Sequence, residues 1–105
     1  MHIQINTDSN IEGDNALAQR VETMVRETLD HFSRQITRVE VHLSDQNSGS
    51  KSGTEDKRCL LEVRLIDHQP TAVSHQASTL EQAVDGAAKK MKRLLESTLG
   101  RLGNR

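Results

Sequence analysis

The sequence predicts an α+β fold, a two-layer sandwich with a four-stranded sheet and both helices on one of its faces. Two long segments carry apolar residues at helical spacing, and four short segments alternate apolar with polar residues. Their order along the chain is β-α-β-β-β-α. The chain has 105 residues, the usual length of one domain, so we expect residues 1–105 to fold as a single unit.

The first strand and the first helix occupy the first third of the chain. Ile3 and Ile5 alternate with polar neighbours, as in a short strand. A polar turn containing Gly13 and Asp14 follows, and either residue suits the N-cap of a helix. The helix is expected over residues 14–33, with its apolar residues in one stripe. The stripe consists of Leu17, Val21, Met24, Val25, Thr28, Leu29 and Phe32.

Three more strands are predicted from alternating apolar and polar residues in the middle of the chain. The first two of them are separated by a polar, Gly/Ser-rich stretch at residues 45–56, which is typical of a hairpin loop. A turn at residues 67–70 precedes the last strand. The inward positions are Val39, Val41 and Leu43, then Cys59, Leu61, Val63 and Leu65, and finally Val73, His75 and Ala77.

The second helix begins at Ser78 or Thr79, because Thr79 with Gln82 fits a capping box. Gly100 and Gly103 mark its end. Its apolar stripe consists of Leu80, Val84, Ala87, Ala88, Met91, Leu94, Leu95, Leu99 and Leu102. Two strands joined by a helix should be parallel, the hairpin strands should be antiparallel, and both helices need the same sheet face to cover their stripes.

The composition excludes several classes of protein. No apolar run approaches the roughly 18 residues of a membrane span, and the N-terminus lacks the pattern of a signal peptide. The one cysteine, Cys59, cannot form an internal disulfide and fits a reducing compartment. The one aromatic residue, Phe32, excludes base stacking on an aromatic platform. A net charge of −1 argues against a uniformly basic protein that coats nucleic acid.

That net charge hides an uneven distribution. Residues 1–34 hold three basic and six acidic side chains, whereas residues 79–105 hold six basic and three acidic ones. The basic side chains of the second helix are Lys89, Lys90, Lys92, Arg93 and Arg101. They form either a solvated helix face that complements the helix dipole or a ridge that binds the phosphates of an RNA backbone.

A second basic set lies on the predicted strands. Arg38, Arg58 and Arg64 have the parity opposite to the core residues, so they should stand on the sheet face away from the helices. Glu40 and Glu62 alternate with them, which favours cross-strand charge pairing over RNA binding on this face.

No arrangement of residues indicates catalysis. The five histidines are scattered without the spacing of a zinc site. Cys59 has the parity of buried strand residues, so it is interpreted as a small hydrophobe and not as a nucleophile. The Gly49 and Gly53 stretch precedes a strand and not a helix, unlike a phosphate-binding loop. We therefore expect no metal, no cofactor and no enzymatic activity.

Several short motifs occur at fixed places in this layout. The triplet N-I-E at residues 10–12 precedes the first helix, which ends in D-H-F-S-R at residues 30–34. A Val-x-Val-x-Leu strand follows, and A-V-D-G-A at residues 83–87 precedes Lys90 and Arg93. In these motifs, and in their order, nearly the whole chain resembles the ribosome hibernation promoting factor and ribosome-associated inhibitor family, also called sigma-54 modulation proteins.

The resemblance implies a cytoplasmic protein that is not an enzyme and that binds the small ribosomal subunit. Members of this family occupy the channel used by mRNA and tRNA, contact ribosomal RNA through basic side chains, and silence idle ribosomes. Lys90 and Arg93 match basic positions of the family's second helix, and Lys89 and Lys92 are their neighbours. The chain ends near the end of its last helix, as in the short type that lacks a dimerisation domain.

Two functions stay open at this point. The first is hibernation by blocking the decoding region, with the five basic residues of the second helix on ribosomal RNA and Arg38, Arg58 and Arg64 as a secondary set. The alternative is a protein-interaction module on the same fold, suggested by the acidic first two-thirds and by residues 97–99, where the family commonly has lysines. No membrane or DNA partner is expected. The oligomeric state stays open, because an exposed edge of the fourth strand could pair between two copies.

Overall fold

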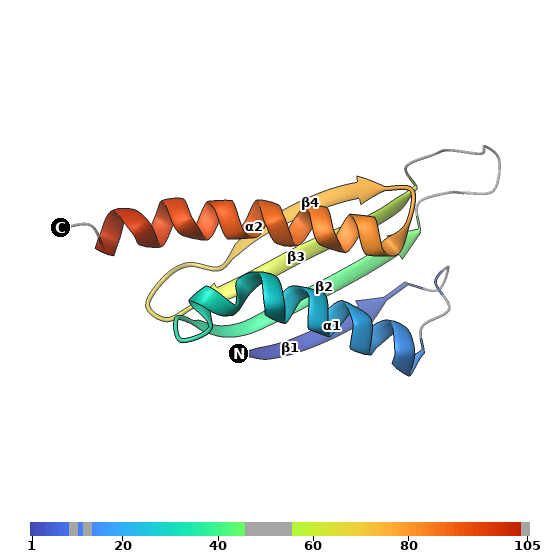
Figure 1. The fold of residues 1–105 in the computed structure, drawn as a ribbon, viewed down its shortest axis with the longest axis horizontal. Helices are drawn as coiled ribbons and strands as arrows, with labels where there is room; N and C mark the ends of the chain where they lie inside the picture. The colour runs from blue at the N-terminus through green and yellow to red at the C-terminus, as the bar shows by residue number, and fades with distance from the viewer. Residues whose placement is uncertain (9–10, 12–13, 46–55, 104–105) are drawn as a thin grey trace.

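The computed structural model describes residues 1–8, 11, 14–45 and 56–103, the last four of them as backbone only. The elements follow the predicted order β-α-β-β-β-α (Figure 1). They are β1 (His2–Thr7), α1 (Asn15–Leu29), a 3₁₀ turn (Asp30–Phe32), β2 (Ile36–Asp45), β3 (Lys57–Leu65), β4 (Thr71–Ala77) and α2 (Leu80–Gly103). The predicted hairpin loop, apart from Asp45 and Asp56, lies outside the described residues, as does Gly13.

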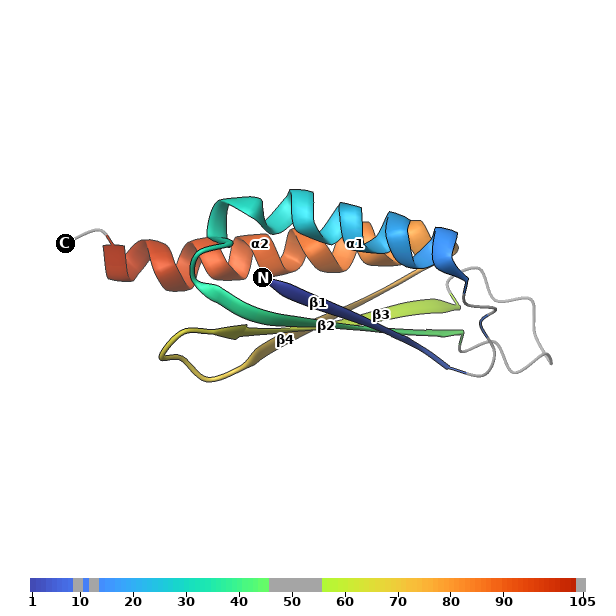
Figure 2. The ribbon, with the colours of Figure 1, turned by 90° about the horizontal axis from the view of Figure 1, so that it is seen from below.

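The four strands form one sheet in the order β1-β2-β3-β4. β1 and β2 are parallel, and the other two pairs are antiparallel, as predicted. Both helices cover the same face of the sheet, which confirms the two-layer arrangement (Figure 2). The last turns of α2 extend past the end of the sheet (Figure 1).

Each helix begins with a side-chain cap. The Asp14 carboxylate accepts a hydrogen bond from the Leu17 N–H at 2.7 Å, so Asp14 is the N-cap of α1. At α2, the Thr79 hydroxyl accepts from the Gln82 N–H at 3.1 Å. The Ser78 hydroxyl donates to the Gln82 side chain at 2.8 Å. Both candidate residues therefore take part in the start of α2.

The prediction of one helix over residues 14–33 is wrong in its last turn. The α-helix ends at Leu29, and Asp30–Phe32 form a 3₁₀ turn. This tighter turn leads the chain toward β2, while the Phe32 ring stays buried. The apolar stripe correctly indicated burial of Phe32 but could not distinguish the two helix types.

The core fills the space between the sheet and the helices. No polar or charged residue of the described chain is buried. The side chains with no exposed area are Val21, Val25 and Leu29 of α1, Val39 and Val41 of β2, Cys59, Leu61 and Val63 of β3, and Ala83, Val84, Ala87, Ala88, Met91 and Leu95 of α2. Cys59 is therefore a core residue, and this burial raises the pKa of its thiol to about 12.

α2 and β4 approach each other closely at Gly86. A methyl group on Gly86 would lie only 2.1 Å from Cδ2 of the His75 ring. His75 is half-buried on the inward face of β4, as predicted. The glycine therefore leaves room for the imidazole between strand and helix.

We expect Gly86→Ala to lower the free energy of unfolding by about 1–3 kcal/mol, because an added methyl group overpacks this contact. In a His75→Ala background the same substitution should instead stabilise by up to about 1 kcal/mol, the ordinary preference of a helix for alanine over glycine. Urea denaturation of the four variants measures both values. An equal loss in both backgrounds would show that the imidazole does not limit the approach.

Cys59 should react far more slowly in the folded protein than in the unfolded chain. A rise in pKa from 9.0 to about 12 leaves about a thousandfold less thiolate at neutral pH, and burial blocks access as well. Ellman's reagent at pH 8, with and without urea, measures the ratio on the protein's single thiol. The unfolded thiol ionises near pH 9 and the folded one near 12, so stability should also fall as the pH rises through this range. Equal reaction rates of the thiol with and without urea would contradict the placement of Cys59 in the core.

Candidate nucleic-acid interface

The basic residues of α2 lie on its exposed side. Lys89, Lys90, Lys92 and Arg93 are all exposed, while the opposite side of the same turns buries apolar side chains. Residues three and four positions apart are neighbours on a helix. Lys89, Lys92 and Arg93 therefore form one cluster, which we call the outer ridge. The Arg101 side chain lies outside the described residues.

The four cations differ in how they are engaged. Lys89 forms an exposed ion pair with Asp85, one turn earlier, at 3.0 Å. The Lys90 Nζ donates to the Ser74 carbonyl at 2.8 Å, so this side chain bends over the outer strand β4. Lys92 and Arg93 make no hydrogen bond or ion pair with any residue that the structure describes. The structure therefore separates Lys90 from the three residues of the outer ridge.

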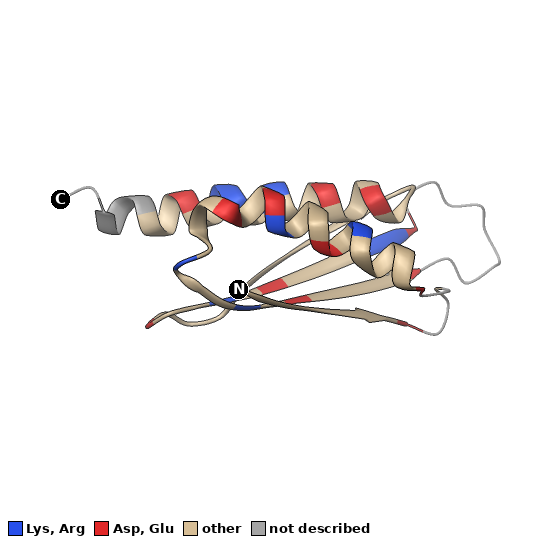
Figure 3. Ribbon diagram, turned by 60° about the horizontal axis from the view of Figure 1, so that its bottom comes forward, with Lys and Arg blue, Asp and Glu red and all other residues tan. Residues whose placement is uncertain are grey.

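Acidic residues surround the outer ridge on the helix layer. Basic and acidic positions alternate along α1, whereas α2 carries Glu81 and Asp85 before the outer ridge and Glu96 after it (Figure 3). Arg20 of α1 reaches Glu81 of α2 at 3.3 Å, and Arg26 pairs with Glu22 within α1 at 2.8 Å. Both arginines of α1 are thus neutralised, and the outer ridge is a local cationic site on a mixed surface.

The strand arginines stand on the open sheet face, but the expected cross-strand pairing with glutamates is wrong. The register places Arg38 opposite Arg64, and Glu40 opposite Glu62. This register follows from the core, because it sets Val39 against Val63 on the other face. Arg38 instead donates to Glu40 on its own strand, at 2.9 Å.

Arg38 and Glu40 belong to a closed ring of side chains on β1 and β2. Arg38 also donates to the Gln4 side-chain oxygen. Gln4 donates to Asn6 at 3.2 Å, and Asn6 Nδ2 lies 3.5 Å from His42 Nδ1. His42 Nε2 closes the ring at 3.3 Å from Glu40. The hydrogen bond from Arg38 holds the pKa of Glu40 below its ordinary value; desolvation opposes this shift, and Coulombic attraction to Arg38 and the His42 contact add to it.

Gln4, Asn6 and His42 were not predicted as partners in a network with Arg38. Their outward parity was visible in the alternation, but their meeting depends on the β1–β2 register, which pairs Gln4 with Glu40 and Asn6 with His42. The consequence is that Arg38 is already satisfied and neutralised. It is the least available of the three strand arginines.

A hollow of about 410 Å³ lies at one end of the open sheet face. Residues of three strands line it, among them Asn6, Thr7, His42, Ser44, Arg58 and Leu60. Arg58 forms no ion pair within the described part of the chain. It lies opposite the neutral residues Ser44 and Gln76. We call this feature the Arg58 hollow.

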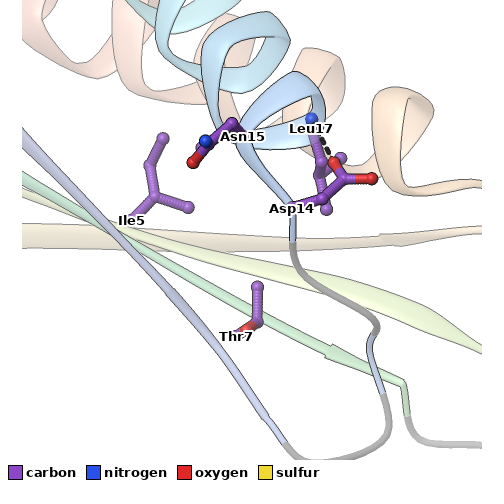
Figure 4. Close-up of a pocket in the computed structure, with 6 residues that line it drawn as sticks. Ile5, Thr7, Asp14, Asn15 and Leu17 are labelled. Atoms are coloured by element: carbon purple, nitrogen blue, oxygen red, sulfur yellow. Dashed lines mark hydrogen bonds between the residues drawn. The ribbon is translucent and has the colours of Figure 1, made fainter.

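A smaller hollow of about 270 Å³ lies at the start of α1 (Figure 4). Ile5 and Thr7 of β1 line one side, and Asp14, Asn15 and Leu17 line the other. Helix N-termini attract anions, but here the Asp14 carboxylate already accepts the Leu17 N–H. Its negative charge disfavours a second anion, so this hollow does not resemble a phosphate site.

No metal site or membrane span was found in the described residues. They contain no cluster of three or more His, Cys, Asp or Glu side chains placed to hold a metal ion. Neither helix combines the length and the apolar character of a membrane span over the residues described.

Known proteins resemble this chain over nearly its whole length. The sequence profile described as "Sigma 54 modulation protein / S30EA ribosomal protein" matches residues 3–102. The N-terminal domain of Protein Y from Thermus thermophilus has a similar structure, with a TM-score of 0.73 and 19% identity over 93% of this chain and 99% of that one. A ribosomal subunit interface protein from Coxiella burnetii gives a TM-score of 0.76 and 15% identity over 95% and 99%.

At these identities the two structures establish a shared fold. No curated protein sequence matches the chain. The profile match, in contrast, extends through every element from β1 to α2. The chain therefore belongs to the sigma-54 modulation protein / S30EA ribosomal protein family.

Proposed function

We propose that this protein binds the small ribosomal subunit through ribosomal RNA phosphates and blocks the decoding region, so that idle ribosomes are silenced. The family match over residues 3–102 is the observation that carries the proposal. The similar structure from Coxiella burnetii, that of a ribosomal subunit interface protein, agrees with such a role. The mechanism is occupancy of a channel, without chemistry, in the cytoplasm and under conditions of stress.

The outer ridge is the part of the surface best suited to the phosphates. Three cations fall within about one turn of a helix whose other side is fixed in the core. Such contacts position a protein on RNA without reading its sequence. This agrees with a chain whose one aromatic residue is buried and so offers no stacking platform.

The basic residues should not contribute equally. Lys92 and Arg93 can bind phosphate without giving up a partner in the part of the chain that the structure describes. Lys89 must give up its ion pair with Asp85 to bind a phosphate, and exposed ion pairs of this kind are worth only about 0–1 kcal/mol. Lys90 must leave the Ser74 carbonyl. Arg101 stays in the proposal as a further contact, and of the strand residues Arg58 and Arg64 are better placed than Arg38.

A second candidate function is binding to a protein partner on the same fold. The observation in its favour is the acidic charge balance of the first part of the chain, where residues 1–34 hold three basic and six acidic side chains. A basic protein surface would complement these acidic residues. Capture of one protein partner without ribosomal RNA would favour this candidate.

Sucrose-gradient sedimentation with purified small subunits tests the first proposal. At about 50 mM salt the protein should sediment with the subunits, and at about 200 mM a large part should be released, because counterion release makes phosphate binding strongly salt-dependent. A protein that stays at the top of the gradient at both salt concentrations would exclude the proposed function.

The outer ridge can be tested by a matched pair of double variants. Lys92→Ala/Arg93→Ala should reduce the slope of log affinity against log salt by about two, one for each lost phosphate contact. Arg26→Ala/Arg34→Ala removes the same charge from the other helix and its following turn, and should leave the slope unchanged. If both double variants lower the slope equally, the net charge of the protein and not the outer ridge governs binding.

A further inference from the structure

The open sheet face carries a second basic feature that the outer ridge does not explain. The Arg58 hollow lies on the layer opposite the helices, at the end of β2 and β3 near the hairpin. Because the hollow and α2 lie on opposite layers of the protein, one flat surface cannot contact both. Any ligand of this hollow is therefore separate from the phosphates proposed for α2.

Arg58 keeps its charge available, unlike two other cations of the strands. The neighbouring Lys57 is held by Asp56 at 3.1 Å and Asp45 at 3.5 Å. Arg38 is held by Glu40 and Gln4 in the ring. Arg58, in contrast, is only half-exposed, forms no ion pair among the described residues, and faces uncharged cross-strand neighbours. Partial burial strengthens its field, and its guanidinium offers several donors in one plane.

The other side chains in the hollow add donors. The Ser44 hydroxyl and the Asn6 amide can each donate a hydrogen bond, and His42 borders the same space. Leu60 supplies apolar surface beside them. A guanidinium with neutral donors beside it is suited to the oxygens of a phosphate group.

One acidic residue also borders the hollow. Asp8 lines its rim, and its Oδ2 accepts the Asp45 N–H at 3.2 Å, which ties the end of β1 to the end of β2. Its negative charge should keep phosphate binding modest. The backbone hydrogen bond holds this carboxylate at the rim, where it keeps its negative charge.

We propose that the Arg58 hollow binds a single phosphate group that carries a nucleoside, with the phosphate at Arg58 and Ser44 and the sugar against Leu60. This goes beyond the proposed function, because binding here needs neither the ribosome nor the outer ridge. The phosphate can come from a free mononucleotide or from an RNA strand, and the experiment below distinguishes these two sources.

The test is an NMR titration of the ¹⁵N-labelled full chain at constant chloride-balanced ionic strength. The probes are inorganic phosphate, adenosine 5′-monophosphate, adenosine and a single-stranded tetra-adenylate. Phosphate and the monophosphate should shift the amides of Asn6, Thr7 and Ser44 in a saturable way, and adenosine should not. Tetra-adenylate that binds more tightly than the monophosphate indicates RNA as the source, whereas equal affinity indicates a mononucleotide.

Arg58→Ala should weaken monophosphate binding about ten- to hundredfold, the range for a charge-assisted hydrogen-bonded contact. Arg64→Ala is the matched control, because it removes the same charge from the same face of the same strand, outside the hollow. Equal weakening by both variants, adenosine shifts equal to those of the monophosphate, or no saturable shift would each overturn the proposal. Ribosome sedimentation of Arg58→Ala is measured separately, so failure here leaves the proposed function standing.

Discussion

Burial of alternate side chains on β2 and β3 is the constraint on which the rest of the structure depends. Val41 of β2 lies directly opposite Leu61 of β3, and neither has exposed area. A shift of the register by one residue would bring every such side chain to the solvent face. This buried face has to be covered, and two amphipathic helices cover it. The charged residues therefore lie on the outer side of the helix layer and on the open sheet face.

The same register determines the electrostatics of the open face. It places Arg38 opposite Arg64 and Glu40 opposite Glu62, although like charges directly opposite each other are unfavourable. The chain relieves this within β2 and toward β1, where Arg38 bonds to Glu40 and Gln4. Packing on one side of the sheet thus decides which arginines on the other side are satisfied. Arg58 has no acidic residue opposite it, and its charge stays available.

Periodicity was sufficient to predict the element order, the parallel and antiparallel pairs, the shared helix face and the burial of Cys59. These depend on local patterns, with spacing near two or near 3.6 residues. Periodicity could not predict the contacts between segments that are far apart in the sequence. Lys90 reaches the Ser74 carbonyl and Gly86 makes room for His75 only because α2 crosses β4 there. The ring around Glu40 likewise depends on the β1–β2 register. A count of basic residues on α2 could not show which of them already had partners.

A net charge near zero restricts where RNA can approach this protein. In the proposed complex, Glu81 and Asp85 occupy the first turns of α2, and Glu22 lies on α1. These carboxylates cancel the charges of Arg20, Arg26 and Lys89, so this part of the helix layer offers an RNA strand little net attraction. On the helix layer, approach is favourable from Lys89 onward, toward the part of α2 that extends beyond the sheet (Figure 1). In the proposed complex the acidic residues thereby disfavour other orientations, because they cancel the cations that would hold RNA elsewhere on the helix layer.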